Sequence, residues 1–493
     1  MALTNEELCE ATAGELSEAL SHGNTTSVHI VSALVERAAK IDAAGTDVEL
    51  RSILALAPDA IEAAQRADDE RASGTLRSRL HGIPILVKDN IEAVGLPGTA
   101  GSTALLGRPV LCDSPVAARL REAGLIIFGA TNLSQWANMR SPYSTSGWSA
   151  VGGLTANPFR LDRCAGGSSS GSGAALAARL TPLAVGTETD GSITCPASLN
   201  GVVGLKPTVG TLPGEGIVPI AASQDSAGPM ARTVLDTAAL FEVLVGGSDV
   251  VERTMHGARN ARIAVATNYM TGHGATDEIF RSAVQKARDA GFEFLNIDVA
   301  VPNQSVGADE VTVLLCEMAD DLSAFLTRRG GDGPLTLADV IGFEDLHAEI
   351  ELPHFGHEFL VQSLATGGRN GSSYKDARAR NLSWAVEECL SPALSDADCF
   401  IAPSYAPAWK NDFVIGGNGG APGSPVTQAP AIAGWPIATV PMGLVDGLPV
   451  GLSIVGRPGS ETTLLAVAHM FEQTLGLIED GTLVPGFRQA TRG

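Results

Sequence analysis

The sequence contains few charged residues, and the basic ones are in the minority. Charged side chains make up 18% of the 493 residues, and 33 Lys and Arg face 55 Asp and Glu, for a formal net charge of −22. No run of basic residues interrupts this acidity. Because proteins hold phosphate backbones with clustered Lys and Arg, we expect no nucleic-acid partner. A large net charge keeps a protein soluble, and this is a sufficient explanation of the excess of acidic residues.

Cysteine is scarce and irregularly placed. The seven cysteines are odd in number, and no two have the CxxC spacing. This pattern argues against both a disulfide framework and a zinc site. The chain also lacks a run of 18 apolar residues, and its start, "MALTNEELCE", lacks the basic and then apolar pattern of a secretory signal. We therefore predict a cytoplasmic protein with no membrane contact and no metal.

Hydrophobic residues are abundant at 44%, and their spacing alternates between helical and strand patterns. Helices are predicted at 26–41, 57–72, 114–124 and 276–290. Buried strands are predicted at 82–90, 125–131, 261–267, 292–298, 398–404, 436–443 and 449–456. This alternation favours one contiguous α/β domain over residues 1–493, with helices on both faces of a sheet. We interpret 305–395 as a helical insertion and 416–425 as a mobile glycine-rich loop, which together shape the entrance to a cleft.

One stretch at 166–192 reads "GGSSSGSGAALAARLTPLAVGTETDGS". It is no linker, because an apolar helix–strand pattern follows the serines at once. A Walker phosphate loop would need Lys-Ser/Thr after the glycines, and GxGxxG is absent. The segment "GSSSG" (167–171) does match the G-x-S-x-G nucleophile elbow, with Ser169 at its centre. However, the preceding "PFRLDRCAG" is a poor strand pattern, and the late histidines His354, His357 and His469 lie on ordinary helical patterns.

A second feature is Lys88, which ends the apolar run "IPILV" and is one of only six lysines. A serine hydroxyl is a weak nucleophile and needs a neighbouring base. Lysine serves as that base only when its amine is neutral, which burial or nearby positive charge brings about. A lysine at a strand end ordinarily reaches solvent. Its rarity here and the serine cluster downstream favour a functional role.

Two long motifs are similar to those of a known family. The segment 166–208, from "GGSSSGSG" to "VVGLKPT", resembles the signature of the amidase signature hydrolases, and "HGIPILVKDN" (81–90) resembles the segment with their catalytic lysine. The likeness runs from "TSVHIVSALVERAAKID" to "GLPVGLSIVG". "TETDGSI", "SGWSA" and "SQDSAGPMAR" most resemble bacterial peptide amidases, whereas many other members carry a second glycine at the position of Asp190. The resemblance implies a mixed central sheet and no cofactor.

By position, the resemblance implies a Ser-Ser-Lys triad. Ser192 would be the nucleophile, Ser168 the bridging serine after a cis peptide bond, and Lys88 the base. Ser169 would either support the triad or cap the following helix. The oxyanion of the reaction would be held by four consecutive backbone N–H groups, those of Thr189, Asp190, Gly191 and Ser192.

Five further residues are expected to act outside the triad. Lys206 in "GLKPT" matches a family position, and we expect it to support structure. Asp225 and Arg232 in "SQDSAGPMAR" are expected to form a structural pair or a pocket wall. Trp148 either lines the cleft or packs in the core, and Cys195 is expected to pack.

The resemblance implies that the protein hydrolyses amides through an acyl-enzyme. The substrate that it favours most is the C-terminal carboxamide of peptides or of N-acylamino acid amides. A broad aliphatic or aryl amidase is an alternative. Another is the glutaminase (A) subunit of a tRNA-dependent amidotransferase, which passes ammonia to a partner. A non-catalytic binding protein is disfavoured, because all three triad residue types are present. We expect a small-molecule or short-peptide substrate and a monomer or homodimer.

Overall fold

The computed structural model describes residues 3–414, 417–418 and 423–489, so part of the loop predicted at 416–425 lies outside the described residues. The strands are β1 (Ile53–Leu56), β2 (Pro84–Lys88), β3 (Ile126–Thr131), β4 (Trp148–Ser149), β5 (Gly153–Leu154), β6 (Ala156–Asn157), β7 (Arg160–Cys164), β8 (Leu183–Glu188), β9 (Val203–Lys206), β10 (Ser226–Ala231), β11 (Ile263–Ala266), β12 (Phe294–Ile297), β13 (Cys399–Pro403), β14 (Ile437–Val445) and β15 (Leu448–Gly456).

The helices before the segment of the predicted insertion are α1 (Asn5–Glu10), α2 (Ala13–Ser21), α3 (Ser27–Ile41), α4 (Ala60–Ala72), α5 (Pro115–Glu122), α6 (Ser170–Ala177), α7 (Thr194–Asn200), α8 (Val234–Val245), α9 (Val250–His256) and α10 (Gly274–Asp289). Those in it and after it are α11 (Gln304–Arg329), α12 (Leu337–Leu346), α13 (Ala348–Glu351), α14 (Glu358–Thr366), α15 (Ser372–Leu382), the π-helical turn η5 (Ser383–Leu390), α16 (Ser391–Ala393), α17 (Gln428–Ala433) and α18 (Glu461–Leu475). Short 3₁₀ turns are η1 (Thr103–Leu105), η2 (Gln135–Asn138), η3 (Gly257–Asn260), η4 (Gly368–Asn370) and η6 (Pro425–Thr427).

Every helix and strand that the hydrophobic spacing predicted is present, with ends that differ by a few residues. One judgement was wrong, because the poor strand pattern at 158–166 contains β7. This strand pairs with β6 in a small two-stranded sheet and is mostly half-buried. Such a hairpin is held by its backbone ladder and needs no apolar run, so hydrophobic spacing could not reveal it.

The central sheet is mixed and has 11 strands in the order β1-β3-β2-β8-β10-β9-β14-β15-β13-β11-β12. Strands β3, β2 and β8 run parallel to one another, as do β13, β11 and β12. The remaining neighbours are antiparallel. The sheet therefore has a parallel group on each side of an antiparallel centre, and β2 and β8 lie next to each other in the first group.

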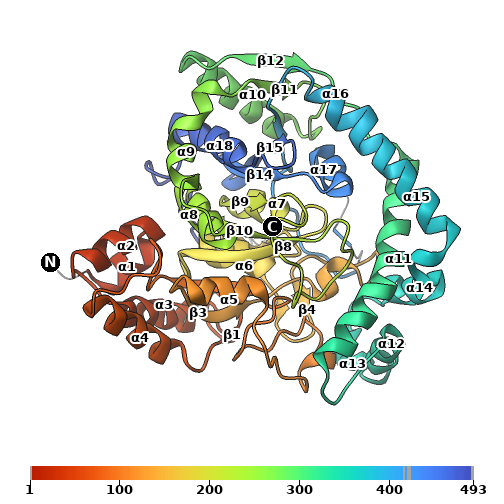
Figure 1. Ribbon diagram of the computed structural model, residues 1–493, viewed down its shortest axis with the longest axis horizontal. Helices are drawn as coiled ribbons and strands as arrows, with labels where there is room; N and C mark the ends of the chain where they lie inside the picture. Colours follow the sequence, from red (N-terminus) through yellow and green to blue (C-terminus); the bar gives the residue numbers. More distant parts are fainter. Residues whose placement is uncertain (1–2, 415–416, 419–422, 490–493) are drawn as a thin grey trace.

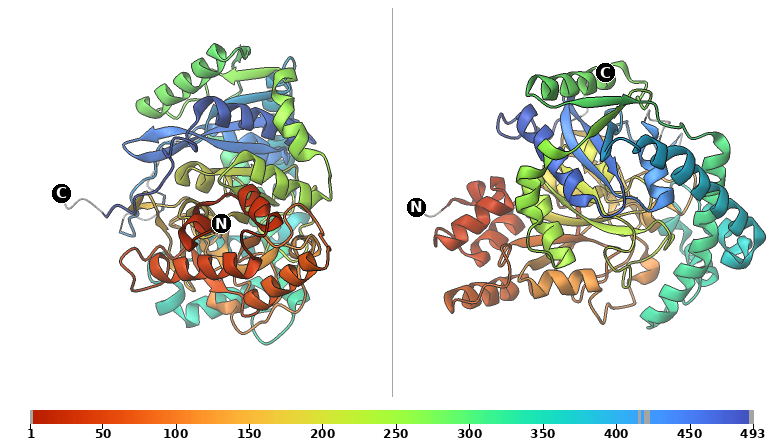
Figure 2. Two further views of the ribbon diagram at one scale, coloured as in Figure 1. Left: turned by 90° about the vertical axis from the view of Figure 1, so that its left-hand side faces the viewer. Right: turned by 45° about the horizontal axis from the view of Figure 1, so that its top comes forward.

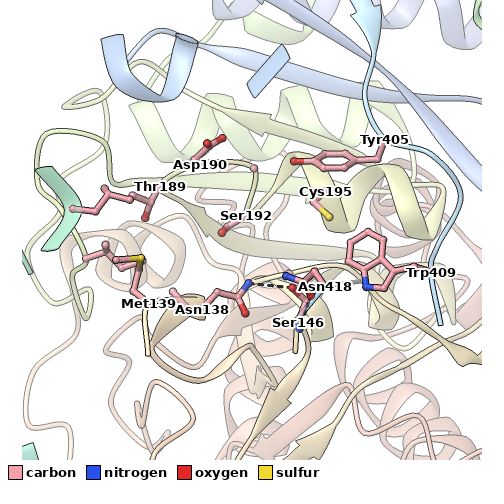
Figure 3. Close-up of a pocket in the computed structure, with 15 residues that line it drawn as sticks. Asn138, Met139, Ser146, Thr189, Asp190, Ser192, Cys195, Tyr405, Trp409 and Asn418 are labelled. Atoms are coloured by element: carbon pink, nitrogen blue, oxygen red, sulfur yellow. Dashed lines mark hydrogen bonds between the residues drawn. The ribbon is translucent and has the colours of Figure 1, made fainter. Parts of the chain in front are cut away.

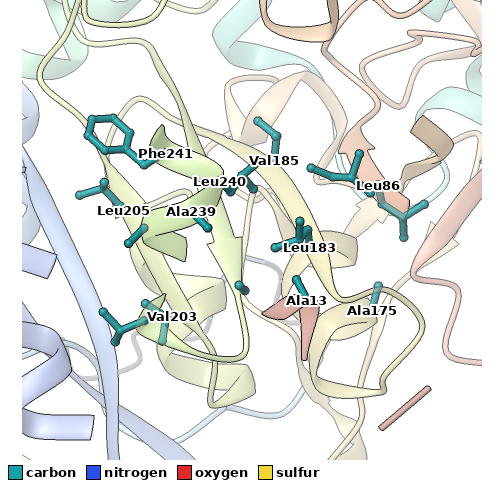
Figure 4. Close-up of a cluster of buried hydrophobic side chains, with 14 of the residues drawn as sticks. Ala13, Leu86, Ala175, Leu183, Val185, Val203, Leu205, Ala239, Leu240 and Phe241 are labelled. Carbon is teal, nitrogen blue, oxygen red and sulfur yellow. The ribbon is translucent and has the colours of Figure 1, made fainter. Parts of the chain in front are cut away.

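Helices pack on both faces of the sheet, as expected, because neighbouring residues of a strand point to opposite sides. On β9, Gly204 faces the start of α7, where an added Cβ would lie 2.6 Å from Ile193 Cγ2. The next residue, Leu205, belongs to the main core cluster with Leu240 and Phe241 of α8 (Figure 4). Helices α10 and α18 contribute to the same cluster, so α7 covers one face and these helices the other.

Two helical groups flank the sheet on opposite sides of the molecule. The first four helices, α1 to α4, lie at one side, and α11 to α15 form an arc at the other, as Figure 1 and the right-hand view of Figure 2 show. The second group corresponds to the segment in which an insertion was predicted, 305–395. Among the described helices, none combines the length and the apolar character needed to cross a lipid bilayer.

Candidate active site

The candidate site lies where two neighbouring parallel strands end. Lys88 is the last residue of β2, and Thr187 and Glu188 are the last two of β8. Because both strands run in the same direction, their carboxyl ends meet at one edge of the sheet. Ser168, just before α6, reaches this edge and contacts Lys88. The turn that carries Ser192, between β8 and α7, lies beside it.

Lys88 is fully buried and bonded to two hydroxyls. Its Nζ lies 2.8 Å from Ser168 Oγ, 2.8 Å from Thr187 Oγ1 and 3.3 Å from the Thr187 carbonyl oxygen. Burial lowers the pKa of this amine to about 7, against the nearby carboxylates of Asp225 and Glu188, which raise it. Near neutral pH a substantial fraction of the amine is therefore uncharged and can accept a proton from Ser168.

The two serines before α6 have different surroundings. The Gly167–Ser168 peptide bond is cis, as the resemblance implied, and Ser168 is fully buried. Ser169 occupies the N-cap position of α6, yet its side chain makes no capping hydrogen bond, so the capping interpretation was wrong. Its hydroxyl instead donates to the Thr187 carbonyl at 3.1 Å and accepts from the Thr187 N–H at 3.2 Å. Ser169 thus holds the residue that accepts from Lys88.

The turn between β8 and α7 presents Ser192 and a set of backbone donors to a pocket. Ser192 is 6% exposed, lines the pocket and accepts the Ser169 N–H at its carbonyl oxygen at 3.1 Å. Within the described part of the chain, none of the four N–H groups of residues 189–192 donates a hydrogen bond. These donors are consequently available to an oxygen atom that carries developing negative charge. Figure 3 shows Ser192 on this turn, next to Thr189 and Asp190.

Glu188, which was not predicted from the sequence as a site residue, fixes the shape of this turn. Its buried carboxylate accepts from the Ile193 N–H at 2.7 Å, from the Thr194 N–H at 2.8 Å and from Thr194 Oγ1 at 3.0 Å. A carboxylate is favoured at a helix start, where backbone N–H groups lack partners. The bonds join the end of β8 to the start of α7 and close the turn of residues 189–193 between them. An acidic residue within the apolar strand "LAVGTE" was the available signal.

Tyr405 was also missed, and it packs directly on the turn. Gly191 has φ +75°, and a Cβ added there would lie 2.5 Å from the Tyr405 hydroxyl oxygen. Only glycine meets both requirements, because it tolerates positive φ and leaves room for the phenol. Burial, together with the nearby Cys195, Asp190 and Glu188, holds the pKa of the Tyr405 hydroxyl well above its usual value, so it stays neutral.

The pocket beside Ser192 has a volume of about 410 Å³. The 189–192 turn and Tyr405 form one side, and Asn138, Ser146, Trp409 and Asn418 form the opposite side (Figure 3). Its apolar lining includes Met139, Ile220 and Leu314. No Lys or Arg lines it in the described part of the chain. The site can therefore take an uncharged group of moderate size next to a serine hydroxyl.

Comparison with known proteins identifies the family. The sequence profile of the family named Amidase matches residues 29–465. The chain belongs to the amidase signature family. A putative amidase of Schizosaccharomyces pombe is 33% identical, with 96% of this chain and 86% of that protein aligned. The A subunit of the glutamyl-tRNA(Gln) amidotransferase of an Anaeromyxobacter species is also 33% identical, over 97% of this chain and 98% of that protein.

Among solved structures, the native peptide amidase of Stenotrophomonas maltophilia is similar throughout. It is 39% identical, with a TM-score of 0.88, and the alignment covers 94% of this chain and 97% of that one. The amidase signature fold with its mixed 11-stranded sheet is thus the fold of this chain. The family is one of hydrolases, and the chain is an amidase-family enzyme.

In this amidase, the expected pairing of Asp225 with Arg232 is absent. Asp225 accepts from Thr189 Oγ1 at 2.6 Å and from two backbone N–H groups, whereas Arg232 donates to backbone carbonyls, including that of Thr181 at 3.3 Å. Strand β10 runs between the two residues and, at about 3.3 Å per residue, holds them at opposite ends. Asp225 instead lines a second cavity of about 480 Å³, which shares Thr189 with the first, so the pocket-wall alternative is confirmed for Asp225 but not for Arg232, which lines neither cavity.

The remaining predicted residues, Lys206, Trp148 and Cys195, are all buried. Lys206 is buried and donates to the Pro207 carbonyl at 3.1 Å, as expected for a structural residue. Burial lowers the pKa of its amine to about 8. Trp148 packs on Phe355, and the Arg140 guanidinium lies over its ring, with 4.9 Å between Arg140 Cζ and the ring centroid. Of the two roles expected for Trp148, these contacts favour packing in the core. Cys195 packs in a buried cluster, as expected, and also lines the pocket.

Proposed function

We propose that this amidase hydrolyses the C-terminal carboxamide of peptides or of N-acylamino acid amides to the free acid and ammonia. The observation that carries the proposal is the buried contact of Lys88 Nζ with Ser168 Oγ at 2.8 Å, at the edge of the pocket that Ser192 lines. An uncharged lysine in contact with one serine, beside a second serine with unpaired backbone donors, suits acyl transfer.

In the first half of the proposed reaction, Ser192 Oγ attacks the carbonyl carbon and forms the new C–O bond. Its proton passes to Ser168 Oγ, whose own proton passes to Lys88 Nζ, which becomes an ammonium group. The carbonyl oxygen becomes an oxyanion and accepts hydrogen bonds from the backbone N–H groups of the 189–192 turn. Because these N–H groups have no partner within the described part of the chain, no hydrogen bond to them has to break there when the charge develops.

Collapse of the tetrahedral intermediate then breaks the C–N bond. The Lys88 ammonium returns a proton through Ser168 to the leaving nitrogen, because an unprotonated amide nitrogen is a poor leaving group. Ammonia departs and leaves an ester on Ser192. Water attacks this ester, its proton follows the same route, and release of the acid restores the Ser192 hydroxyl.

The peptide-type substrate is supported by the 39% identity to the peptide amidase and by the pocket lining, which includes no Lys or Arg among the described residues. A pocket without Lys or Arg offers no partner to a free terminal carboxylate, whereas a carboxamide carries no charge. Leu314 of α11 lines the pocket, and this supports the proposal that the helical segment 305–395 shapes its entrance. A broad aliphatic or aryl amidase would use the same triad.

A second candidate is the glutaminase subunit of a tRNA-dependent amidotransferase, which the 33% identity to such subunits favours. It would need partner subunits, whereas the first proposal needs only a short substrate and a monomer or homodimer. The net charge of −22 supports an enzyme that binds no nucleic acid itself. All seven cysteines are unpaired, in keeping with a reducing compartment such as the cytoplasm, and we propose no membrane partner.

The deciding experiment measures product release from a dipeptide amide, the free dipeptide, glutamine, acetamide and an anilide. Wild type is compared with Ser192→Ala and Lys88→Ala. We expect ammonia from the dipeptide amide, abolished in both variants. Activity on glutamine alone would favour the amidotransferase subunit, and turnover that survives Ser192→Ala would overturn the assignment of the nucleophile.

A further inference from the structure

Three residues that line the pocket each have a buried side-chain atom with no hydrogen-bond partner within the described part of the chain. One is the carboxyl oxygen Oδ1 of Asp190, on the 189–192 turn. The other two are the indole Nε1 of Trp409, which is a donor, and Oδ1 of Asn138, which is an acceptor. Leaving such atoms unpaired destabilises a folded protein, so native structures rarely do so without a functional reason. A donor and an acceptor in one pocket are complementary to a ligand that has both.

One of the two polar atoms of the Asn138 side-chain amide already has a partner in the structure. Its Nδ2 donates to Ser146 Oγ at 3.1 Å, and the Ser146 N–H donates to Asn418 Oδ1 at 3.0 Å (Figure 3). The amide nitrogen of Asn138 is therefore occupied, and its oxygen is the atom left for a ligand. Figure 3 shows Asn138 and Trp409 together on the side of the pocket opposite the 189–192 turn.

The backbone that carries Asn138 is strained. Trp136, Ala137 and Asn138 have φ values of 48°, 52° and 73°, so three successive non-glycine residues are left-handed. Trp136 anchors this segment, because its Nε1 donates to Glu344 at 2.7 Å. Left-handed residues other than glycine cost free energy and cluster at ligand-binding sites. Here the strained segment lines the pocket with Ala137 and Asn138.

We propose that Trp409 and Asn138 bind the acylamino group next to the scissile carboxamide. The Trp409 Nε1–H would donate to the acyl carbonyl, and Asn138 Oδ1 would accept from the adjacent N–H. A substrate without the acylamino group would leave both protein atoms unpaired and would therefore bind poorly. Polar sites discriminate strongly against analogues that lack a hydrogen-bonding group for which the site has a partner. The inference rests on the proposed function, and it defines the substrate class as N-acylated amino acid amides rather than simple aliphatic amides.

The first test compares two amides that differ only in the acylamino group, N-acetyl-leucinamide and 4-methylpentanamide. For Trp409→Phe, kcat/KM on N-acetyl-leucinamide should fall about tenfold more than on 4-methylpentanamide, as expected for one lost hydrogen bond. Trp384→Phe is the matched control, because Trp384 is buried in a different cluster. Equal losses on the two substrates would overturn the role of Trp409.

The second test uses Asn138→Gly, which removes the acceptor and tolerates the left-handed backbone. The substrate 2-acetoxy-4-methylpentanamide replaces the N–H of N-acetyl-leucinamide by an ester oxygen. Asn138→Gly should lower kcat/KM for N-acetyl-leucinamide about tenfold more than for this ester analogue. A loss that is the same for both substrates would overturn the role of Asn138.

A binding measurement separates this inference from the proposed function. In a Ser192→Ala background, calorimetry with N-acetyl-leucinamide should give a Kd that rises about tenfold on Trp409→Phe and is unchanged by Trp384→Phe. If this holds while wild type releases no ammonia, the binding inference stands and the proposed function fails. If wild type releases ammonia but Trp409→Phe leaves the Kd unchanged, the binding inference fails and the proposed function stands.

Discussion

The Nζ of Lys88 lies 2.8 Å from the Oγ of Ser168, and neither side chain is exposed to solvent. A charged ammonium could only donate to Ser168, whereas a neutral amine can accept its proton. The burial that excludes solvent from this contact also lowers the pKa of Lys88 to about 7. The site therefore places a base of nearly neutral pKa directly against the serine that would relay protons.

This relationship predicts the pH dependence of the reaction. Below about pH 7 Lys88 is protonated and cannot act as base, so kcat/KM should rise as the pH passes through about 7 and level off above it. The measurement is kcat/KM on a dipeptide amide between about pH 5 and pH 9, the range in which this base titrates. Lys88→Ala should lose about 10² to 10⁴ in rate, the usual effect of removing a general base. An optimum near about pH 5, with activity lost above neutrality, would contradict a lysine base.

Asp225 should set the pH at which kcat/KM rises, which we call the acidic limb of the pH profile. Its negative charge raises the pKa of Lys88, and its own pKa is raised to about 7 by burial. In Asp225→Asn the charge is gone, so the acidic limb of kcat/KM should move to lower pH. The amide keeps the shape, because its oxygen can accept from the Ile220 and Ala221 N–H groups and its nitrogen can donate to Thr189 Oγ1.

The matched control for this variant is Glu278→Gln, which removes one charge at an exposed position. It should leave the limb unchanged. A limb that moves to higher pH in Asp225→Asn would contradict the electrostatic coupling, and an equal shift in both variants would point to net charge instead.

Much of the site was predictable because its chemistry lies in two continuous motifs. Lys88 ends a recognisable apolar run, and Ser168 and Ser192 lie in one stretch that folds as loop, helix, strand and turn. The fold was predictable for a similar reason, since buried strands and amphipathic helices have distinct hydrophobic spacing. Where the spacing is weak, as in the half-buried strand β7, the prediction failed.

The pocket residues outside the two motifs could not be predicted, because they come from distant segments of the chain. Tyr405 and Trp409 follow β13, and Asn138 lies in η2, so only the packed tertiary structure brings them to Ser192. The false pairing of Asp225 with Arg232 has the same origin. Seven positions are near in sequence, but an extended strand turns them into a separation of about 20 Å.

Gly191 should tolerate no side chain unless Tyr405 loses its hydroxyl. In Gly191→Ala the new Cβ would lie 2.5 Å from the Tyr405 hydroxyl oxygen, and the turn that carries the backbone donors must shift. Misplacing one such donor costs about 10² to 10³ in kcat, so we expect a loss of that size. In Gly191→Ala/Tyr405→Phe the nearest remaining atom is Cζ at 3.7 Å, an ordinary contact, so part of the activity should return.

Gly272→Ala is the matched control for the backbone. Gly272 has φ +77° and no atom within 4 Å of an added Cβ, so it reports the cost of the left-handed conformation alone. That cost is about 1 to 2 kcal/mol in the free energy of unfolding, measured by urea denaturation, with no effect on kcat. A double variant no more active than Gly191→Ala would show that the phenol is not the obstacle.

Cys195 lines the pocket next to the nucleophilic turn, yet it should take no part in catalysis. Burial raises the pKa of its thiol to about 12, so at about pH 8 hardly any reactive thiolate is present. Iodoacetamide should therefore label the exposed Cys112 and leave both Cys195 and the activity intact, as peptide mapping and ammonia release would report. Cys112→Ser serves as the control without the exposed thiol, and Cys195→Ala should keep most of its activity. Inactivation that runs in parallel with labelling of Cys195 would instead require a thiol within the catalytic machinery.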